Sequence, residues 1–374
     1  MDLSRYSLYP HQAAGIQFLA RHGRAILADD MGLGKTRQAI VALNEAAPSG
    51  AVLAICPASL ELNWAREIQM VDANAAVDVI GVPGHQAASA RWVVVNYDLL
   101  ARHAERLRAI PWAGVVIDEA HFIKNASQRT SQVLKIIGVA DSKREAPTGP
   151  RLVFLLTGTP MPNRPRDLFN LLRATGHPSA RSFLSFARRY CGAYRNDYGW
   201  VTDGASNIVE LNLLLKEVML RREKDDVLDL PPKIRSRVPV QIDAAGAWKA
   251  YSDFVEWFRG SDPSRPNDTE FLARITKLRL ALHKAKHAAC AERIRDVLVT
   301  GQRVIVFTSY SEGITRHKKL LGDKAVTITG ADNAKQRMAA TDAGVRPDIC
   351  IGGDDFRTSA ELASAFVASF QCEG

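Results

Sequence analysis

The stretch that most constrains this chain is a short apolar segment, residues 25–28, followed by a glycine-rich turn. Residues 29–36 read Asp-Asp-Met-Gly-Leu-Gly-Lys-Thr, and helix-forming residues continue from Lys35. A buried strand that turns through glycines into a helix is typical of a phosphate-binding loop, because backbone N–H groups and the helix N-terminus attract anions. The pattern therefore predicts a nucleotide site at the end of this strand.

Each position of the loop has a predicted role. The backbone around Gly32, Leu33 and Gly34 would surround the phosphates, the Lys35 amine would add a full positive charge, and the Thr36 hydroxyl would bind magnesium. The usual pattern has glycine five residues before Gly34, where this chain has Asp29. Upstream, residues 7–22 predict a helix, and Gln12 on it could read an adenine edge through its amide. The alternative is a solvated glutamine on a surface helix.

Further apolar runs alternate with helical patterns along the first half of the chain. They lie at residues 51–56, 93–95, 114–117 and 152–156. This alternation predicts an α/β fold with a parallel, doubly wound sheet whose ligands gather at the carboxyl ends of the strands. Ser59 and Tyr97 fall at such ends, where hydroxyls could hold a nucleic-acid backbone without reading its sequence. A helix cap and a packed aromatic are the alternatives for these two residues.

The run at residues 114–121 ends in Asp118-Glu119-Ala-His121. An aspartate at a strand end can hold magnesium, and a following glutamate can orient and polarise an attacking water. His121 is placed to sense the nucleotide state. The catalytic candidates are therefore Lys35, Asp118, Glu119 and His121, and the metal candidates are Thr36 and Asp118.

Composition limits the class of protein. The 374 residues are enough for two domains, and no apolar run is long enough to span a bilayer. The five cysteines show no CxxC spacing, which favours a reducing, intracellular (cytoplasmic) compartment over a disulfide framework. The formal charge of +9 is compatible with a polyanionic partner such as DNA, although many unrelated proteins are as basic.

Taken in order, these motifs resemble Swi/Snf-type ATPases, the double-stranded-DNA translocase branch of the DEAD/DEAH helicase superfamily. The matching segments are Gln12, residues 29–36, Cys-Pro-Ala-Ser-Leu (56–60) with Asn63-Trp64, Asp-Glu-Ala-His (118–121) with Lys124-Asn125, and Leu-Thr-Gly-Thr-Pro (156–160) with Asn163. Asp29 in place of glycine is itself similar to that branch. Residues 186–191 and 219–231 resemble its smaller annealing-helicase-like members.

The resemblance implies a RecA-like ATPase lobe that binds ATP and Mg²⁺ and moves along double-stranded DNA through backbone contacts, without sequence preference. In that family Gln12 would recognise adenine. His121, Thr157 and Thr159 would link the nucleotide state to the grip on DNA, together with Ser59 and Tyr97. An unrelated phosphate-loop enzyme, such as a small-molecule kinase, would not need these motifs in this order.

The resemblance also implies a division of the chain: a first RecA-like lobe at 1–165, a basic helical insertion at 166–240, inter-lobe helices at 241–300, and part of a second RecA-like lobe at 301–374. Residues 301–310 resemble the strand that opens that second lobe, and residues 326–330, 336–337 and 370–371 continue the resemblance. We expect the second lobe to be incomplete, because the later motifs with the arginine finger are not found. An arginine finger is worth about 10³ to 10⁵ in turnover.

Two functions therefore stay open. One is a DNA translocase, either as encoded or with its missing part supplied by a partner chain, and the other is a nucleotide-gated DNA-binding protein with little hydrolysis.

Two further patterns have both a functional and an ordinary interpretation. Between residues 165 and 240, arginines such as Arg188, Arg195 and Arg222 interleave with aromatics, which would suit DNA phosphates or an ordinary solvated helical surface. On a long helix predicted over 271–298, His283, His287 and Cys290 share one face. Zinc accepts such ligands, but no fourth ligand is evident.

Overall fold

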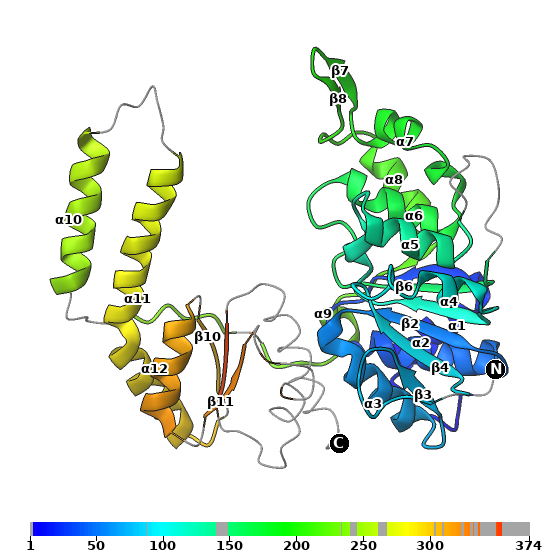
Figure 1. Ribbon diagram of the computed structural model, residues 1–374, viewed down its shortest axis with the longest axis horizontal. Helices are drawn as coiled ribbons and strands as arrows, with labels where there is room; N and C mark the ends of the chain where they lie inside the picture. The colour runs from blue at the N-terminus through cyan, green and yellow to red at the C-terminus, as the bar shows by residue number, and fades with distance from the viewer. Residues whose placement is uncertain are drawn as a thin grey trace. The chain divides into compact units, whose positions relative to one another are not determined.

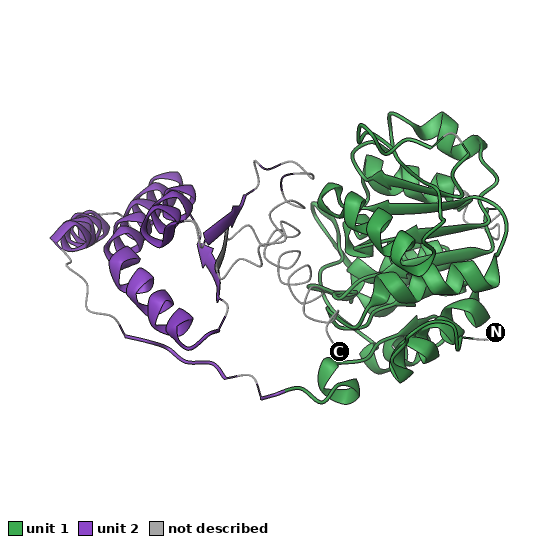
Figure 2. Ribbon diagram, turned by 90° about the horizontal axis from the view of Figure 1, so that it is seen from below, with its two compact units in different colours: residues 1–230 green, residues 231–374 purple. Residues whose placement is uncertain are grey.

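The structure is a computed structural model in which the chain forms two compact units, Met1–Leu230 and Pro231–Gly374 (Figures 1 and 2). It describes residues 3–87, 89–139, 149–232, 234–239, 245–260, 268–302, 304–308, 310–322, 325–329, 332, 336 and 349–353. Residues 370–371, which we expected to resemble a second lobe, lie outside the described residues.

Unit 1 is built on a seven-stranded sheet with the order β3-β4-β2-β5-β6-β1-β9, and its strand pairs are parallel. The strands are β1 (Arg24–Leu27), β2 (Val52–Cys56), β3 (Val77–Val79), β4 (Trp92–Asn96), β5 (Gly114–Ile117), β6 (Leu152–Leu156) and β9 (Met219–Leu220). Strands β2, β5 and β6 are apolar in unbroken runs, and the residues of β2, β4, β5 and β6 are buried throughout. Such strands need cover on both faces of the sheet.

Helices supply that cover (Figure 1). The helices of unit 1 are α1 (Pro10–His22), α2 (Lys35–Ala46), α3 (Glu61–Val71), α4 (Ala104–Ala109), α5 (Gln128–Ile136), α6 (Phe169–Thr175), α7 (Phe183–Tyr190), α8 (Ile208–Leu215) and α9 (Lys224–Val227), of which α7 and α8 belong to the helical insertion, with short 3₁₀ turns at Ala58–Leu60, Ala120–Ile123, Pro165–Leu168 and Pro178–Ala180. Pro10 stands in the first turn of α1, where its missing N–H costs nothing and its fixed φ suits a helix. The buried side chains between helices and sheet, such as Ile26, Ile55 and Leu155, form one continuous core.

The helical insertion has a core of its own. Phe186 and Tyr190 of α7 pack with Leu211 and Leu215 of α8, and all four side chains are buried. From this part of unit 1 projects an antiparallel hairpin, β7 (Tyr194–Asn196) with β8 (Gly199–Val201) (Figure 1). The hairpin lies apart from the seven-stranded sheet, so it contributes little to the core that positions the site.

Unit 2 has a smaller parallel sheet. Three strands are described, in the order β10-β12-β11, with β10 at Val304–Thr308, β11 at Ala325–Ile328 and β12 at Ile349–Gly353. Its helices are α10 (Ala245–Gly260), α11 (Asp268–Val299) and α12 (Ser311–Leu321). A small core that includes Ile294, Ile314, Leu321 and Ala325 joins α11 and α12 to the strands.

The predicted α/β class with a parallel sheet is confirmed, and β6 has the predicted bounds. Five of the described strands were missed: β3, β7, β8, β9 and β12 are short or lie where the apolar pattern is weak. The predicted division of the chain at residues 165, 240 and 300 stays a prediction. In the structure, the boundary between the two compact units falls between Leu230 and Pro231. Within the described residues, no helix is both long and apolar enough to cross a membrane.

One buried acid near the carboxyl edge of the sheet has an unusual environment. Glu61, the first residue of α3, is 4% exposed. Its Oε1 accepts a hydrogen bond of 3.0 Å from Nδ2 of Asn96, whose own Oδ1 accepts from the backbone N–H groups of Asp98 and Leu99. Burial raises the pKa of Glu61 to about 7, and the bond from Asn96 opposes the shift only in part.

We predict that Glu61→Gln will flatten the pH dependence of folding. Folded unit 1 holds a proton on Glu61 that the unfolded chain releases near pH 4.5, so its stabilising contribution is present below about 4.5 and is lost as the pH rises through about 7. Urea unfolding should show a loss of roughly 1–3 kcal/mol over this range in the parent chain, and little of it in the variant. Glu105→Gln, an exposed control on α4, should keep the parent slope. An unchanged slope in Glu61→Gln would contradict the assignment.

Candidate nucleotide site

The predicted site segments follow adjacent strands. In the order β5-β6-β1, residues 118–121 leave β5, residues 157–159 leave β6, and residues 28–36 leave β1. The backbone N–H of Thr157 donates to the carbonyl of Leu27 over 3.1 Å, which ties the second of these segments to the third. Because parallel strands end at the same edge, three segments distant in sequence meet there.

The phosphate loop has the backbone that its glycines permit. Gly32 and Gly34 have φ of 85° and 72°, in the left-handed region, and α2 begins directly after Gly34. The Lys35 amine donates to the carbonyls of Asp29 and Asp30, over 2.8 and 3.1 Å. A side chain at Gly158 would place its Cβ 3.8 Å from that amine. Burial lowers the pKa of Lys35, and the carboxylates of Glu119 and Asp118 oppose that shift.

Gln12 lies against this loop. Its side chain is buried, and its Oε1 accepts the backbone N–H of Tyr9 as part of the cap of α1. Its Nε2 faces Gly34 so closely that a Cβ on that glycine would lie 2.3 Å from it. The Gln12 amide therefore lies beside the loop. Its oxygen accepts a hydrogen bond at the start of α1, and its nitrogen lies close to Gly34.

Asp118 is held by an aromatic framework. Its Oδ2 accepts from Nε1 of Trp64 over 2.8 Å, its Oδ1 accepts from the N–H of Glu119, and its carbonyl accepts from the Tyr97 hydroxyl over 2.6 Å. Burial, together with the neighbouring Glu119 carboxylate, raises the pKa of Asp118. A nearby cation would reverse this effect. No role for Trp64 could be predicted from its place in the sequence. Its hydrogen bond shows that it holds the Asp118 carboxylate.

Glu119 has a strained backbone. Its φ of 47° and ψ of 52° put it in the left-handed region, which among the described non-glycine residues only Asn207 shares. Oε2 of Glu119 is buried and receives no hydrogen bond from the described residues, although Nδ1 of His121 lies 3.1 Å from it. A carboxylate oxygen that receives no hydrogen bond from the protein can accept one from a water, as the activation of that water requires.

The four predicted DNA-coupling residues differ in exposure. Thr157 is fully buried, and its hydroxyl accepts the N–H of Thr159, whose own side chain is exposed. Ser59 is half-buried in the turn after β2. Tyr97 is buried, so its hydroxyl contacts the Asp118 carbonyl and not the surface. An influence through Asp118 therefore fits Tyr97 better than a direct contact with DNA does.

Tyr97 also belongs to an aromatic group that extends from the site. Its ring stacks on Phe122 with centroids 5.3 Å apart, Phe122 packs on the His121 ring, and the Arg129 guanidinium lies over both Tyr97 and Phe122. Arg129 in turn pairs with Asp98 over 2.6 Å. These contacts join His121 to a charged pair on the surface of unit 1.

The residues present fit a magnesium ion held with a nucleotide. Thr36 supplies a hydroxyl and Asp118 a carboxylate, and hard oxygen donors are what Mg²⁺ prefers. Among the described residues, no group of three or more His, Cys, Asp or Glu is placed to hold a metal.

The basic segment divides into surface and interior residues. Arg188 is exposed and lies over the exposed ring of Trp200 in the β7–β8 hairpin, 4.8 Å from its centroid. Arg195 is exposed on β7. Arg222 was expected among the residues that face phosphates, but its side chain is only 14% exposed and pairs with Asp29. Its position two residues beyond β9, which pairs with β1, brings it to Asp29 and explains the difference.

The histidine face of α11 packs inside unit 2. His283 shares a hydrogen bond of 3.1 Å with Thr308, and Nδ1 of His287 lies 3.2 Å from Nε2 of His317 on α12. Burial lowers the pKa of all three, that of His287 to about 4, so they are neutral at physiological pH. The ring contacts support packing as their role, which was the alternative to zinc.

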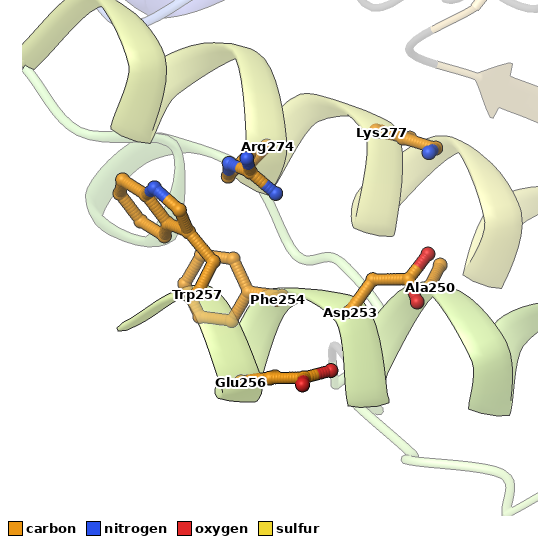
Figure 3. Close-up of a pocket in the computed structure, with 7 residues that line it drawn as sticks. All are labelled: Ala250, Asp253, Phe254, Glu256, Trp257, Arg274 and Lys277. Atoms are coloured by element: carbon orange, nitrogen blue, oxygen red, sulfur yellow. The ribbon is translucent and has the colours of Figure 1, made fainter. Parts of the chain in front are cut away.

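A cavity of about 360 Å³ in unit 2 lies between α10 and α11 (Figure 3). Its lining mixes the rings of Phe254 and Trp257 with charged groups such as Asp253, Arg274 and Lys277. The Arg274 guanidinium lies over the Trp257 ring, 4.9 Å from its centroid. None of the predicted nucleotide-site residues lines it, so the cavity is separate from that site.

Comparison with known proteins agrees with this geometry. The model of the SNF2-related domain matches residues 11–287. The chain belongs to this family. It is 34% identical over 313 residues to the DNA annealing helicase and endonuclease ZRANB3 of Bos taurus, covering 79% of this chain and 28% of that protein. It is 36% identical over 340 residues to the SWI/SNF-related matrix-associated actin-dependent regulator of chromatin subfamily A-like protein 1 of Xenopus laevis, covering 87% and 34%.

This SNF2-related chain thus spans about a third or less of the length of these relatives. Among solved structures, it is similar to the SWI2/SNF2 ATPase core of Sulfolobus solfataricus in complex with dsDNA, with a TM-score of 0.51 and 22% identity. The match covers 93% of this chain and 78% of that one. The predicted family and the RecA-like fold are confirmed.

We predict that Gly34→Ala will destabilise unit 1 more than Gly84→Ala. Both glycines have positive φ, 72° and 82°, so both variants share the cost of a left-handed alanine, about 1–2 kcal/mol. Only at Gly34 would the new Cβ meet an atom, Nε2 of Gln12 at 2.3 Å, whereas nothing lies within 4 Å at Gly84. Overpacking should add about 1–3 kcal/mol in urea unfolding. Equal losses in the two variants would show that Gln12 does not abut the loop.

Proposed function

We propose that this chain is an ATP-dependent translocase that acts on double-stranded DNA and holds ATP with Mg²⁺ in unit 1. The main support is that Lys35 follows β1 while Asp118 and Glu119 follow β5, at the same edge of the sheet, in a member of the SNF2-related family. The carboxylates lie close enough to the Lys35 amine to oppose the effect of burial on its pKa. A cation and two acids in one buried place suit phosphoryl chemistry.

The loop would hold the phosphates. Backbone N–H groups around Gly32, Leu33 and Gly34, together with the N-terminus of α2, would form the anion-binding concavity. The Lys35 amine would exchange its bonds to two loop carbonyls for bonds to phosphate oxygens, and Thr36 would direct its hydroxyl to the metal. Gln12 would contact the base from the first turns of α1, where it lies against the loop.

Glu119 would orient and deprotonate the attacking water. Its buried Oε2 has no donor among the described residues, and its left-handed backbone sets the direction of the carboxylate. Asp118, fixed by Trp64 and Tyr97, would hold the metal ion. When bound there, Mg²⁺ would neutralise charge on the phosphate oxygens.

The coupling to DNA would use the same strand ends. Thr157 is buried against the loop segment, and Thr159 next to it is exposed, so a displacement at the nucleotide can reach the surface through two residues. His121 contacts Glu119 on one side and Phe122 on the other, which opens a second route. Ser59 would contact the phosphate backbone.

The DNA substrate is supported by the relatives. One is named as a DNA annealing helicase, and the structural neighbour was solved with dsDNA. The formal charge of +9 would favour contact with phosphates. No base-reading element was recognised in the sequence, so we propose backbone contacts.

We predict that Lys35→Ala will weaken ATP binding at least roughly tenfold, because a charged hydrogen bond to phosphate is worth about 1.5–3 kcal/mol. Glu119→Gln should bind ATP normally but lose about 10²- to 10⁴-fold in DNA-stimulated turnover, since only the base is removed. The measurements are fluorescent-nucleotide titration and phosphate release with duplex DNA. The exposed residues Lys216 and Glu105 provide matched controls, Lys216→Ala and Glu105→Gln.

The outcomes separate the two candidate functions. DNA-stimulated turnover that depends on Glu119 would support the translocase. ATP binding that depends on Lys35, without turnover in the parent chain, would support the nucleotide-gated DNA-binding protein instead. Unchanged ATP affinity in Lys35→Ala would refute both.

We also predict that the chain binds unrelated duplexes of equal length with affinities within about threefold of one another, and that binding weakens steeply with salt. Fluorescence anisotropy at several salt concentrations measures both quantities. A strong preference for one sequence would refute recognition through the backbone.

A further inference from the structure

The first residue of the phosphate loop is a buried charge with one main partner. Asp29 has no exposed surface, and its two carboxylate oxygens accept from Nε and Nη2 of Arg222, over 2.9 and 2.5 Å. Arg222 lies two residues beyond β9, whose register with β1 brings it to Asp29 from 193 residues away. Two parallel bonds between a guanidinium and a carboxylate fix both side chains in orientation.

Other groups complete the arrangement. Nη2 of Arg222 also donates to Oε1 of Gln38 over 3.0 Å, and Nη1 donates to the carbonyl of His11. Nε2 of Gln38 donates to Asp29 and to the carbonyl of Leu33 inside the loop. We call Asp29, Gln38 and Arg222 the Asp29 cluster. It connects the phosphate loop to α1, α2 and the segment after β9.

The fold makes room for this cluster at a cost. Gly15 stands inside α1, where glycine is less favourable than alanine. A Cβ there would lie 1.8 Å from Oε1 of Gln38 and 2.8 Å from Nη2 of Arg222. The close approach of these two side chains explains the glycine.

The segment after β9 contacts the loop backbone as well. The N–H of Asp30 donates to the carbonyl of Arg222 over 2.9 Å, and the N–H of Lys224 donates to Oδ2 of Asp30. Lys35 donates to the carbonyls of the same two aspartates. The Lys35 amine and the segment that leads out of unit 1, residues 219–230, therefore hold the same two residues.

We propose that Arg222 is a positioning residue of the nucleotide site, which fixes the phosphate loop through Asp29 and so makes the loop respond together with residues 219–230. These residues are the last of unit 1, and the chain continues from them into unit 2. A change in what Lys35 holds would thus reach the connection between the units directly. This coupling rests on the proposed function, because it assumes that the loop binds a nucleotide.

Removal of Arg222 tests the positioning without any nucleotide. Arg222→Gln leaves the Asp29 carboxylate buried and without a cation, which loosens the loop. Hydrogen exchange of the nucleotide-free chain, read by mass spectrometry, should then be roughly tenfold faster or more in the peptide that covers residues 28–36. Arg189→Gln is the matched control, because it breaks a bidentate pair with Glu210 on the surface. Equal exchange of the loop in the parent chain and Arg222→Gln would overturn the proposal.

A second variant guards against simple misfolding. In Asp29→Asn/Arg222→Gln, neither charge is left buried alone, so melting should return toward that of the parent chain. Addition of ADP should slow exchange in residues 219–230 of the parent chain and of Arg189→Gln, but not in this folded double variant, although fluorescent ADP still binds it. Equal protection of residues 219–230 in the double variant would overturn the coupling. A parent chain that binds no nucleotide would instead refute the proposed function, while the exchange of the free loop still tests the positioning.

Discussion

The parallel pairing of β1 with β6 on one side and β9 on the other is the constraint on which the rest of unit 1 depends. It delivers the phosphate loop, the Thr-Gly-Thr segment and the arginines after β9 to one edge of the sheet. Because the pairing is parallel, each strand needs a long connection before its neighbour, and those connections are the helices that bury the sheet. The position of the site therefore follows from the strand order and from the helices that cover the sheet.

The same edge gathers charges that would be costly if they were buried alone. Asp29 has Arg222 and Gln38, Asp118 has Trp64 and a backbone N–H, and Lys35 has two carbonyls. A buried ion needs such partners to remain charged. Because Arg222 and Trp64 are distant in sequence from Asp29 and Asp118, the charges of the site have these partners only when unit 1 is folded.

Much of this arrangement could be predicted from residue patterns. The phosphate loop and the Asp118-Glu119 pair could be placed at one edge of the sheet from the sequence. Strand ends and helix starts depend on local residues, and parallel strands end at the same edge. The role of Arg222 could not be predicted in this way. Strand β9 has two residues and no periodicity, so nothing local says which of several nearby arginines will face Asp29.

For Tyr97, the sequence predicts the position of the residue but not the direction of its side chain. Its position at a strand end was predicted, but the direction of its hydroxyl depends on how tightly Phe122 and Asp118 pack around it. Trp64 is similar, since its indole reaches Asp118 from α3 only after α3 has packed on the sheet. A pattern locates such residues along the chain, and packing decides which way they face.

The left-handed backbone of Glu119 has a consequence for how this chain can vary. A non-glycine residue in that region stores about 1–3 kcal/mol that other contacts must offset. Glycine at this position would release the strain while removing the carboxylate that we propose orients water, so loss of that proposed role and gain of stability would coincide at one residue. Copies of the chain that lost this carboxylate would therefore be the more stable ones, and folding would not select against its loss.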